Sequence, residues 1–117
     1  MNISIVRIAD RGVANQERLH LQALSGADLC FYAVIDTSYS GSGVTAGWKN
    51  VYWFRSHRVK AGDNIVLYTG GGVDVSHANA NGGTDHFFYW GQPKTLWNNP
   101  LACAVVFEVT QWITSPR

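Results

Sequence analysis

Short runs of hydrophobic residues alternate with polar stretches along most of this chain, and two of those runs are the clearest. Residues 51–54 and 65–69 are rich in β-branched and aromatic residues, the composition typical of β-strands. The polar stretch 60–64 lies between them, and its Gly62 can adopt the positive φ angle of a tight turn. Three glycines at 70–72 end the second run. The pattern predicts a β-hairpin at the centre of an antiparallel β-domain.

Further apolar runs, separated by turn residues, lie before and after this hairpin. Stretches rich in Gly, Ser and Asn predict long loops over 36–50 and 70–85. A total of about seven to eight short strands without a convincing helix is typical of a β-sandwich or barrel. The additional strands are expected at 3–8, 29–35, 87–90, 102–109 and 112–113.

The segment 15–26 fits two patterns. Asn15 could cap a helix, and most of the residues after it have good helical propensity. Against a helix, Leu19, Leu21 and Ala23 alternate with polar residues, which is the period of a half-buried strand. We favour the strand, because the leucines of this segment would spread too far around a helix to form one apolar stripe.

Composition and charge fit one globular domain over residues 1–117. Hydrophobic residues make up 46% of the chain, which is enough to form a core and argues against disorder. The formal net charge of +1 argues against a nucleic-acid partner. No apolar run reaches the roughly 20 residues that span a bilayer, and Met1 leads into a strand-like pattern rather than a secretion signal. These features predict a cytoplasmic protein that does not enter a membrane.

The two cysteines, Cys30 and Cys103, both lie inside apolar runs. That position is typical of reduced thiols that pack as small hydrophobic side chains. A disulfide between facing strands is the alternative, but two cysteines in a chain without a secretion signal rarely pair. The pattern favours free thiols.

Three blocks of sequence occur in an order that a known family shares. The first is RIADRG at residues 7–12, the second holds WF and VKAGDNIVLY within 53–68, and the third holds YW and LWNN within 89–99. Together, over most of the chain, they resemble the lamin tail domain. The resemblance implies an immunoglobulin-like antiparallel β-sandwich. It also implies a non-catalytic module that binds proteins or, in some settings, nucleic acid.

Four residues in or beside the Gly-rich stretch 70–85 are candidate metal ligands: Asp74, His77, Asp85 and His86. Carboxylates and imidazoles that converge can hold a divalent ion, which could activate water. Their spacing matches no zinc or calcium motif, and Gly, Asn, Asp and His are also ordinary loop residues. We therefore predict no cofactor and no bound metal, and we keep a small metal-dependent hydrolase as an alternative.

The sequence shows neither a nucleophile–base pair nor a phosphate-binding loop. Arg55 and Arg58 form a basic cluster with neighbouring residues, beside the aromatic run 52–54. Arginine next to exposed rings can bind phosphate or single-stranded nucleic acid. Charges at this place are equally typical of a protected sheet edge, and the near-zero net charge favours that interpretation.

Tryptophans in loop-like surroundings are the strongest candidates for binding. Trp48 lies in the Gly/Ser-rich stretch, and Trp97 is followed by Asn98 and Asn99. Exposed tryptophan is typical of interface anchors and of platforms for sugar rings, although the stretch around Trp97 could equally be a structural corner. The sequence therefore predicts a non-enzymatic binding or assembly module that contacts a protein partner or a second copy. A carbohydrate-binding module is the second hypothesis.

Overall fold

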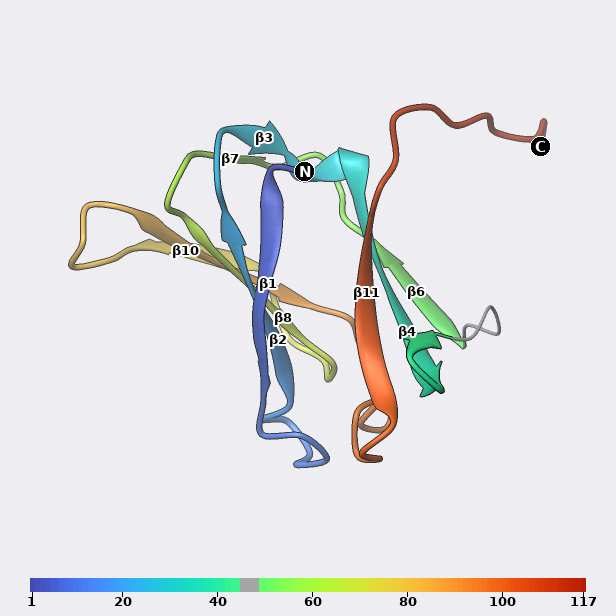
Figure 1. The fold of residues 1–117 in the computed structure, drawn as a ribbon. Helices are drawn as coiled ribbons and strands as arrows, with labels where there is room; N and C mark the ends of the chain where they lie inside the picture. Colours follow the sequence, from blue (N-terminus) through green and yellow to red (C-terminus); the bar gives the residue numbers. More distant parts are fainter. Residues whose placement is uncertain (45–48) are drawn as a thin grey trace.

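Two β-sheets enclose a hydrophobic core in the computed structural model, which describes residues 1–44 and 49–117 (Figure 1). The first sheet has the strand order β1 (Ile3–Ala9), β2 (Arg18–Ala23), β8 (Asn64–Tyr68), β10 (Thr84–Tyr89) and β9 (Val75–Ala78). In the second sheet β4 (Tyr32–Ser40) pairs with β11 (Ala102–Glu108), β6 (Asn50–Trp53) and β5 (Gly43–Val44).

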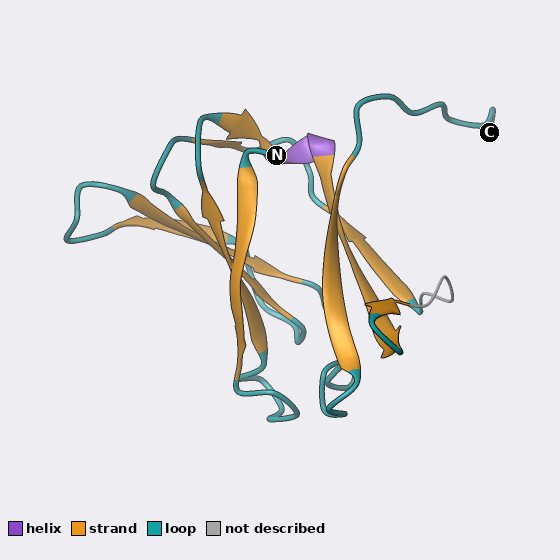
Figure 2. Ribbon diagram, viewed as in Figure 1, coloured by secondary structure: helices purple, strands orange, loops and turns teal. Residues whose placement is uncertain are grey.

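The two sheets are joined by a small two-stranded ribbon and by one short helix. The ribbon pairs β3 (Ala27–Asp28) with β7 (Arg58–Val59), and the helix is the 3-10 turn η1 (Leu29–Phe31). Strands therefore dominate the described part of the chain (Figure 2). The prediction of an all-β, sandwich-like fold is confirmed.

The ambiguous segment 15–26 contains a strand. In β2, the side chains of Leu19, Leu21 and Ala23 are all buried, and the polar residues between them are not. β2 pairs with β1 on one side and with β8 on the other. The two-residue period was therefore the informative signal, because packing against two neighbouring strands outweighs helical propensity.

The predicted hairpin of residues 51–72 is wrong in its pairing. β6 belongs to the second sheet, whereas β8 lies between β2 and β10 in the first. The chain between them crosses from one sheet to the other through β7. The turn itself is as predicted, since Gly62 has a φ of 88° and the Lys60 N–H donates to Asp63 Oδ2.

One pair of strands departs from the predicted antiparallel arrangement. β8 and β10 are parallel, with Asn64 opposite Asp85 and Tyr68 opposite Tyr89. Parallel neighbours require a long connection, and the chain between β8 and β10 provides it. Within that connection β9 folds back and pairs with β10. The stretch 70–85 therefore contains an edge strand and is not the continuous loop that its glycines suggested.

Three other boundaries differ from the prediction. The run 29–35 begins with η1 before β4 starts, and the expected loop over 36–50 contains the second half of β4. β4 continues because β11 pairs with it as far as Ser38, which outweighs the weak strand propensity of these residues. Residues 112–113 form no strand, although they follow β11 closely.

The core lies between the two sheets and draws apolar side chains from both. Leu19 and Leu67 come from the first sheet, Val34 comes from the second, and all three are fully buried. Cys103 is also buried and Cys30 partly so, and both thiols are free, as the sequence favoured. Burial raises the pKa of each thiol, which makes both poor nucleophiles. In the described part of the chain, no helix has the length and apolar character needed to cross a membrane.

Candidate functional site

The tryptophan site predicted from the sequence is not present as expected. Trp97 is 0% exposed and belongs to the hydrophobic core, so the prediction of an exposed binding residue is wrong. Trp48 lies outside the described residues. Asn98 and Asn99 are exposed, but Asn99 accepts hydrogen bonds from Leu101 N–H and Arg11 and so closes a corner of the chain. This stretch is therefore a structural corner, which was the alternative to an exposed binding site in the interpretation of the sequence.

The two predicted basic residues are exposed but have different neighbours. Arg55 forms an ion pair with Asp74 at 3.2 Å, and its guanidinium lies 5.5 Å from the centre of the Phe88 ring. Arg58 lies on β7, opposite Asp28 of β3. Surface ion pairs of this kind contribute little stability, typically about 0–1 kcal/mol.

The four candidate metal ligands do not converge. Asp85 and His86 are neighbours on β10, so their side chains point to opposite faces of the sheet. His77 lies on the exposed edge strand β9, opposite Asp85, and Asp74 pairs with Arg55. Within residues 1–44 and 49–117, no group of three His, Cys, Asp or Glu residues could hold a metal ion.

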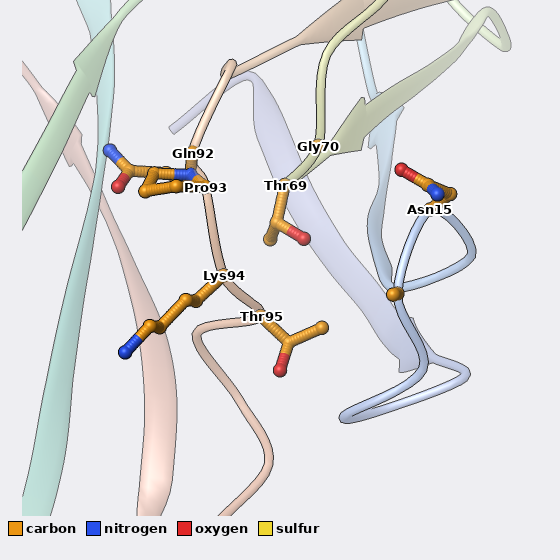
Figure 3. A pocket seen from close by; sticks show the side chains of 8 residues that line it. Asn15, Thr69, Gly70, Gln92, Pro93, Lys94 and Thr95 are labelled. Atoms are coloured by element: carbon orange, nitrogen blue, oxygen red, sulfur yellow. The ribbon is translucent and has the colours of Figure 1, made fainter.

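A small depression lies beside the end of β8 (Figure 3). Its volume is about 50 Å³, far below the roughly 300 Å³ of an ordinary ligand pocket. Gly70 and Asn15 approach each other closely there, since a Cβ on Gly70 would lie 3.3 Å from Asn15 Oδ1. The depression is therefore a tight junction between two loops rather than a binding site.

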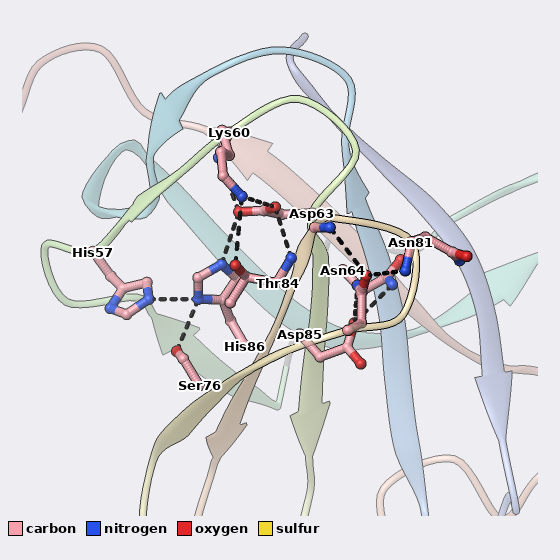
Figure 4. A network of polar contacts seen from close by, with 11 residues as sticks. His57, Lys60, Asp63, Asn64, Ser76, Asn81, Thr84, Asp85 and His86 are labelled. Atoms are coloured by element: carbon pink, nitrogen blue, oxygen red, sulfur yellow. Dashed lines mark hydrogen bonds and ion pairs between the residues drawn. The ribbon is translucent and has the colours of Figure 1, made fainter.

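A polar cluster surrounds His86 of β10, between the first sheet and the segment that leads into β7 (Figure 4). His86 Nε2 lies 2.9 Å from Asp63 Oδ2, and both side chains are buried. His86 Nδ1 lies 2.8 Å from His57 Nε2 and 2.9 Å from the Oγ of the exposed Ser76. No sequence pattern marks this cluster, because its members come from the turn before β8, from β9, from β10 and from the segment before β7.

Hydrogen bonds fix Asp63 from several directions. Lys60 N–H and Lys60 Nζ donate to its two oxygens at 3.1 Å each, and Thr84 N–H donates at 3.1 Å. Burial on its own would raise the pKa of Asp63, but the hydrogen bonds from His86, Lys60 and Thr84 outweigh it and hold the pKa well below its usual range. Asp63 is therefore an ionised, immobile acceptor.

His57 is held in place by its backbone. Its N–H donates to Asp28 Oδ1 at 3.0 Å, and Ser56 Oγ donates to the other oxygen of Asp28 at 2.8 Å. Burial, together with the nearby His86 and Arg55, lowers the pKa of His57. The imidazole is therefore neutral at neutral pH and directs one ring nitrogen toward His86.

The free energy of unfolding is expected to decrease in two steps as the pH is lowered. His57 has a lowered pKa when folded, so its contribution is present above its unfolded pKa of about 6.5 and is lost as pH falls below that value. Asp63 also has a lowered pKa, so its contribution is lost below about pH 4. Urea unfolding at a series of pH values measures both steps.

Matched variants assign the two steps. His57→Gln should reduce the slope of the free energy of unfolding against pH between about pH 7 and 5. Part of that slope should remain, because burial, Arg7 and Arg18 also lower the pKa of His20. Asp63→Asn should reduce the slope below about pH 4, and part of the slope should remain because hydrogen bonds also lower the pKa values of Asp28 and Asp85. Gln22→Ala, at an exposed position of β2 that has no titratable group, is the control and should leave the shape of the curve unchanged. A wild-type stability that stays constant from pH 7 to 3 would contradict the prediction.

The outer face of the second sheet is apolar, which is unusual for a solvated sheet surface. Ala33 and Ile35 of β4 lie beside Trp53 of β6, and Phe107 of β11 flanks them. With Val51, Val109 and Trp112 they line an open hollow of about 240 Å³. We call these seven residues the apolar face.

Aromatic contacts and one hydrogen bond hold the apolar face in shape. The Trp53 indole N–H donates to the Cys30 carbonyl at 2.7 Å. Trp112 packs edge-on against Trp53, with ring centres 4.9 Å apart, and also contacts Phe31 at 5.9 Å. The sequence carried a signal for this face. The apolar runs of β4 and β11 lack the alternation of apolar and polar residues that is typical of a strand with one solvent-exposed face.

Comparisons with models of known protein families, with curated proteins and with solved structures found no match to this chain. The lamin tail resemblance therefore stays a prediction.

Proposed function

We propose that this domain is a protein-interaction module that binds through the apolar face. The observation that carries the proposal is the run of apolar side chains on the outer side of the second sheet. Trp53 and Phe107 are 47% and 41% exposed, and the hollow between the strands is lined by apolar residues. A contiguous apolar patch on a sheet surface is typical of a protein contact, because exposing it to water is unfavourable.

The arrangement of the rings favours a protein over a carbohydrate. A sugar ring stacks on a flat, open aromatic face. Trp53 and Trp112 instead meet at 86°, so that one ring edge covers the other ring's face. The resulting angular surface suits branched apolar side chains, which can pack into the angle beside the two rings.

The partner that fits best is a second copy of the chain. Ile113 follows Trp112 at the rim of the apolar face and is 97% exposed. The chain thus carries a projecting apolar side chain next to an apolar hollow. In a two-fold dimer each Ile113 can enter the hollow of the other copy, because such interfaces use the same patch on both subunits.

The lamin tail resemblance supports the same class of function, since that family consists of binding modules. We infer that the sandwich is of the immunoglobulin-like lamin tail type. The order of the three sequence blocks supports this inference, together with a two-sheet fold in which the VKAGDN turn leads into β8.

Sedimentation velocity over a range of protein concentrations tests the proposal. The wild-type chain should dimerise with a Kd in the micromolar range. Ile113→Asp and Val51→Asp should each weaken the dimer by about 10-fold or more, which is ~1.4 kcal/mol, because each places a charge in the contact. Val73→Asp is the control. Val73 is 85% exposed and is not part of the apolar face, so this change should leave the dimer intact. A chain that stays monomeric up to about 1 mM overturns the proposal.

A further inference from the structure

Ser76, His86 and Asp63 form a hydrogen-bonded series that ends at an exposed hydroxyl (Figure 4). Ser76 Oγ lies 2.9 Å from His86 Nδ1, and His86 Nε2 lies 2.9 Å from Asp63 Oδ2. Ser76 projects from the edge strand β9, where all four residues are exposed. The pairing of β9 with β10 places Ser76 directly opposite His86. A hydroxyl, an imidazole and a carboxylate in this order are the parts of an activated nucleophile.

The hydrogen-bonding partners determine which nitrogen of His86 is the base. Asp63 is ionised and only accepts hydrogen bonds, so His86 Nε2 must carry the proton that bonds it. His86 Nδ1 then presents a lone pair to Ser76. Because Lys60 and Thr84 fix Asp63, the imidazole is held in this tautomer and orientation.

His57 shares that lone pair with Ser76. Arg55 has only N–H groups and lies 3.5 Å from His57 Nδ1, which makes Nδ1 the acceptor and leaves the proton on His57 Nε2. That N–H points at His86 Nδ1 from 2.8 Å. A substrate carbonyl oxygen beside Ser76 could take the His57 N–H instead. His86 Nδ1 would then be free to accept the Ser76 proton, while His57 stabilises the developing oxyanion.

We propose that Ser76 is a catalytic nucleophile for acyl transfer from small, accessible esters. Ser76 Oγ attacks the ester carbonyl as its proton passes to His86 Nδ1, and Asp63 stabilises the resulting imidazolium. The tetrahedral adduct collapses to an acyl-Ser76, and the alcohol leaves with the proton from His86. Water then attacks the acyl group as one of its protons passes to His86 Nδ1. His86 returns that proton to Ser76 Oγ as the Ser76–acyl bond breaks, which releases the carboxylic acid and restores free Ser76. Because Ser76 lies on an open edge, the substrate class is short acyl esters.

Labelling with a fluorophosphonate followed by peptide mass spectrometry tests whether Ser76 is activated. The wild-type chain should gain one phosphonyl group on the peptide that contains Ser76. Ser76→Ala should remain unlabelled, and its fold is not at risk because the position is exposed on an edge strand. Ser40→Ala is the matched control, since Ser40 is another exposed serine on a strand, at the end of β4 in the second sheet.

Hydrolysis of p-nitrophenyl acetate tests the reaction itself. Ser76→Ala should lower the rate by about 100-fold or more, the usual contribution of a positioned acid–base partner to a nucleophile. Ser40→Ala should retain the wild-type rate. Ile113→Asp should also retain it, which separates this proposal from that of dimerisation. Label on other serines, or equal hydrolysis by the wild-type chain and Ser76→Ala, would overturn the assignment.

Discussion

Trp97→Ala is expected to lower the free energy of unfolding by about 3–5 kcal/mol, the usual cost of truncating a buried tryptophan. The Trp97 side chain is 0% exposed and lies in the same core cluster as residues from both sheets. Its ring packs edge-on against Trp90, with centres 6.2 Å apart. Removing the ring therefore leaves a cavity between the sheets. Urea unfolding followed by far-ultraviolet circular dichroism measures the loss.

Trp97→Phe distinguishes the size of the side chain from its polarity. Among the described residues, no group accepts a hydrogen bond from the Trp97 indole N–H. The phenylalanine variant therefore loses packing but no hydrogen bond, and should cost about 1–3 kcal/mol, clearly less than alanine. If Trp97→Ala were as stable as the wild-type chain, Trp97 would have to be exposed, as the sequence predicted.

The local features of this fold were predictable, because neighbouring residues determine them. The alternation of Leu19 and Leu21 identified β2, and Gly62 identified the turn before β8. Strand pairing was not predictable in the same way. Nothing within residues 51–72 distinguishes a hairpin from a crossing between two sheets, since both need two apolar strands and a turn. The choice depends on β4 and β2, which are distant in sequence and supply the pairing edges.

The candidate sites depended on such long-range pairing even more strongly. Trp97 follows a loop-like stretch, and its sequence surroundings are those of an exposed residue. Its backbone N–H nevertheless donates to the side chain of Glu17, 80 residues earlier, and this hydrogen bond helps to hold Trp97 in the core. Ser76 and His86 are ten residues apart, and only the register of β9 against β10 brings them together. The metal hypothesis failed for the same reason, because the pleat of β10 separates Asp85 from His86.

Glu17→Ala is expected to lower the free energy of unfolding by about 3–5 kcal/mol, because it removes a buried side chain that accepts three backbone hydrogen bonds. The Glu17 side chain is 1% exposed although it carries a carboxylate. Its oxygens accept hydrogen bonds from Gly12 N–H and Leu96 N–H at 2.7 Å each and from Trp97 N–H at 3.1 Å. Without the carboxylate, three backbone N–H groups lose their partner, and the Trp97 N–H loses it in a buried position. An unsatisfied buried donor costs about 1–3 kcal/mol, and the two partly buried donors add to that loss.

The consequence extends beyond the loop that contains Glu17. Two of its hydrogen bonds, from Leu96 N–H and Trp97 N–H, join the chain before β2 to the segment that carries Trp97 into the core, so the alanine variant should also expose Trp97. Tryptophan fluorescence should shift to longer wavelength at denaturant concentrations where the wild-type chain remains folded. Glu17→Gln keeps one acceptor oxygen and should lose roughly half as much stability. Glu108→Ala, an exposed position at the end of β11, should change stability by no more than about 0.5 kcal/mol. An equal loss in the Glu17 and Glu108 variants would show that the buried carboxylate does not hold these segments together.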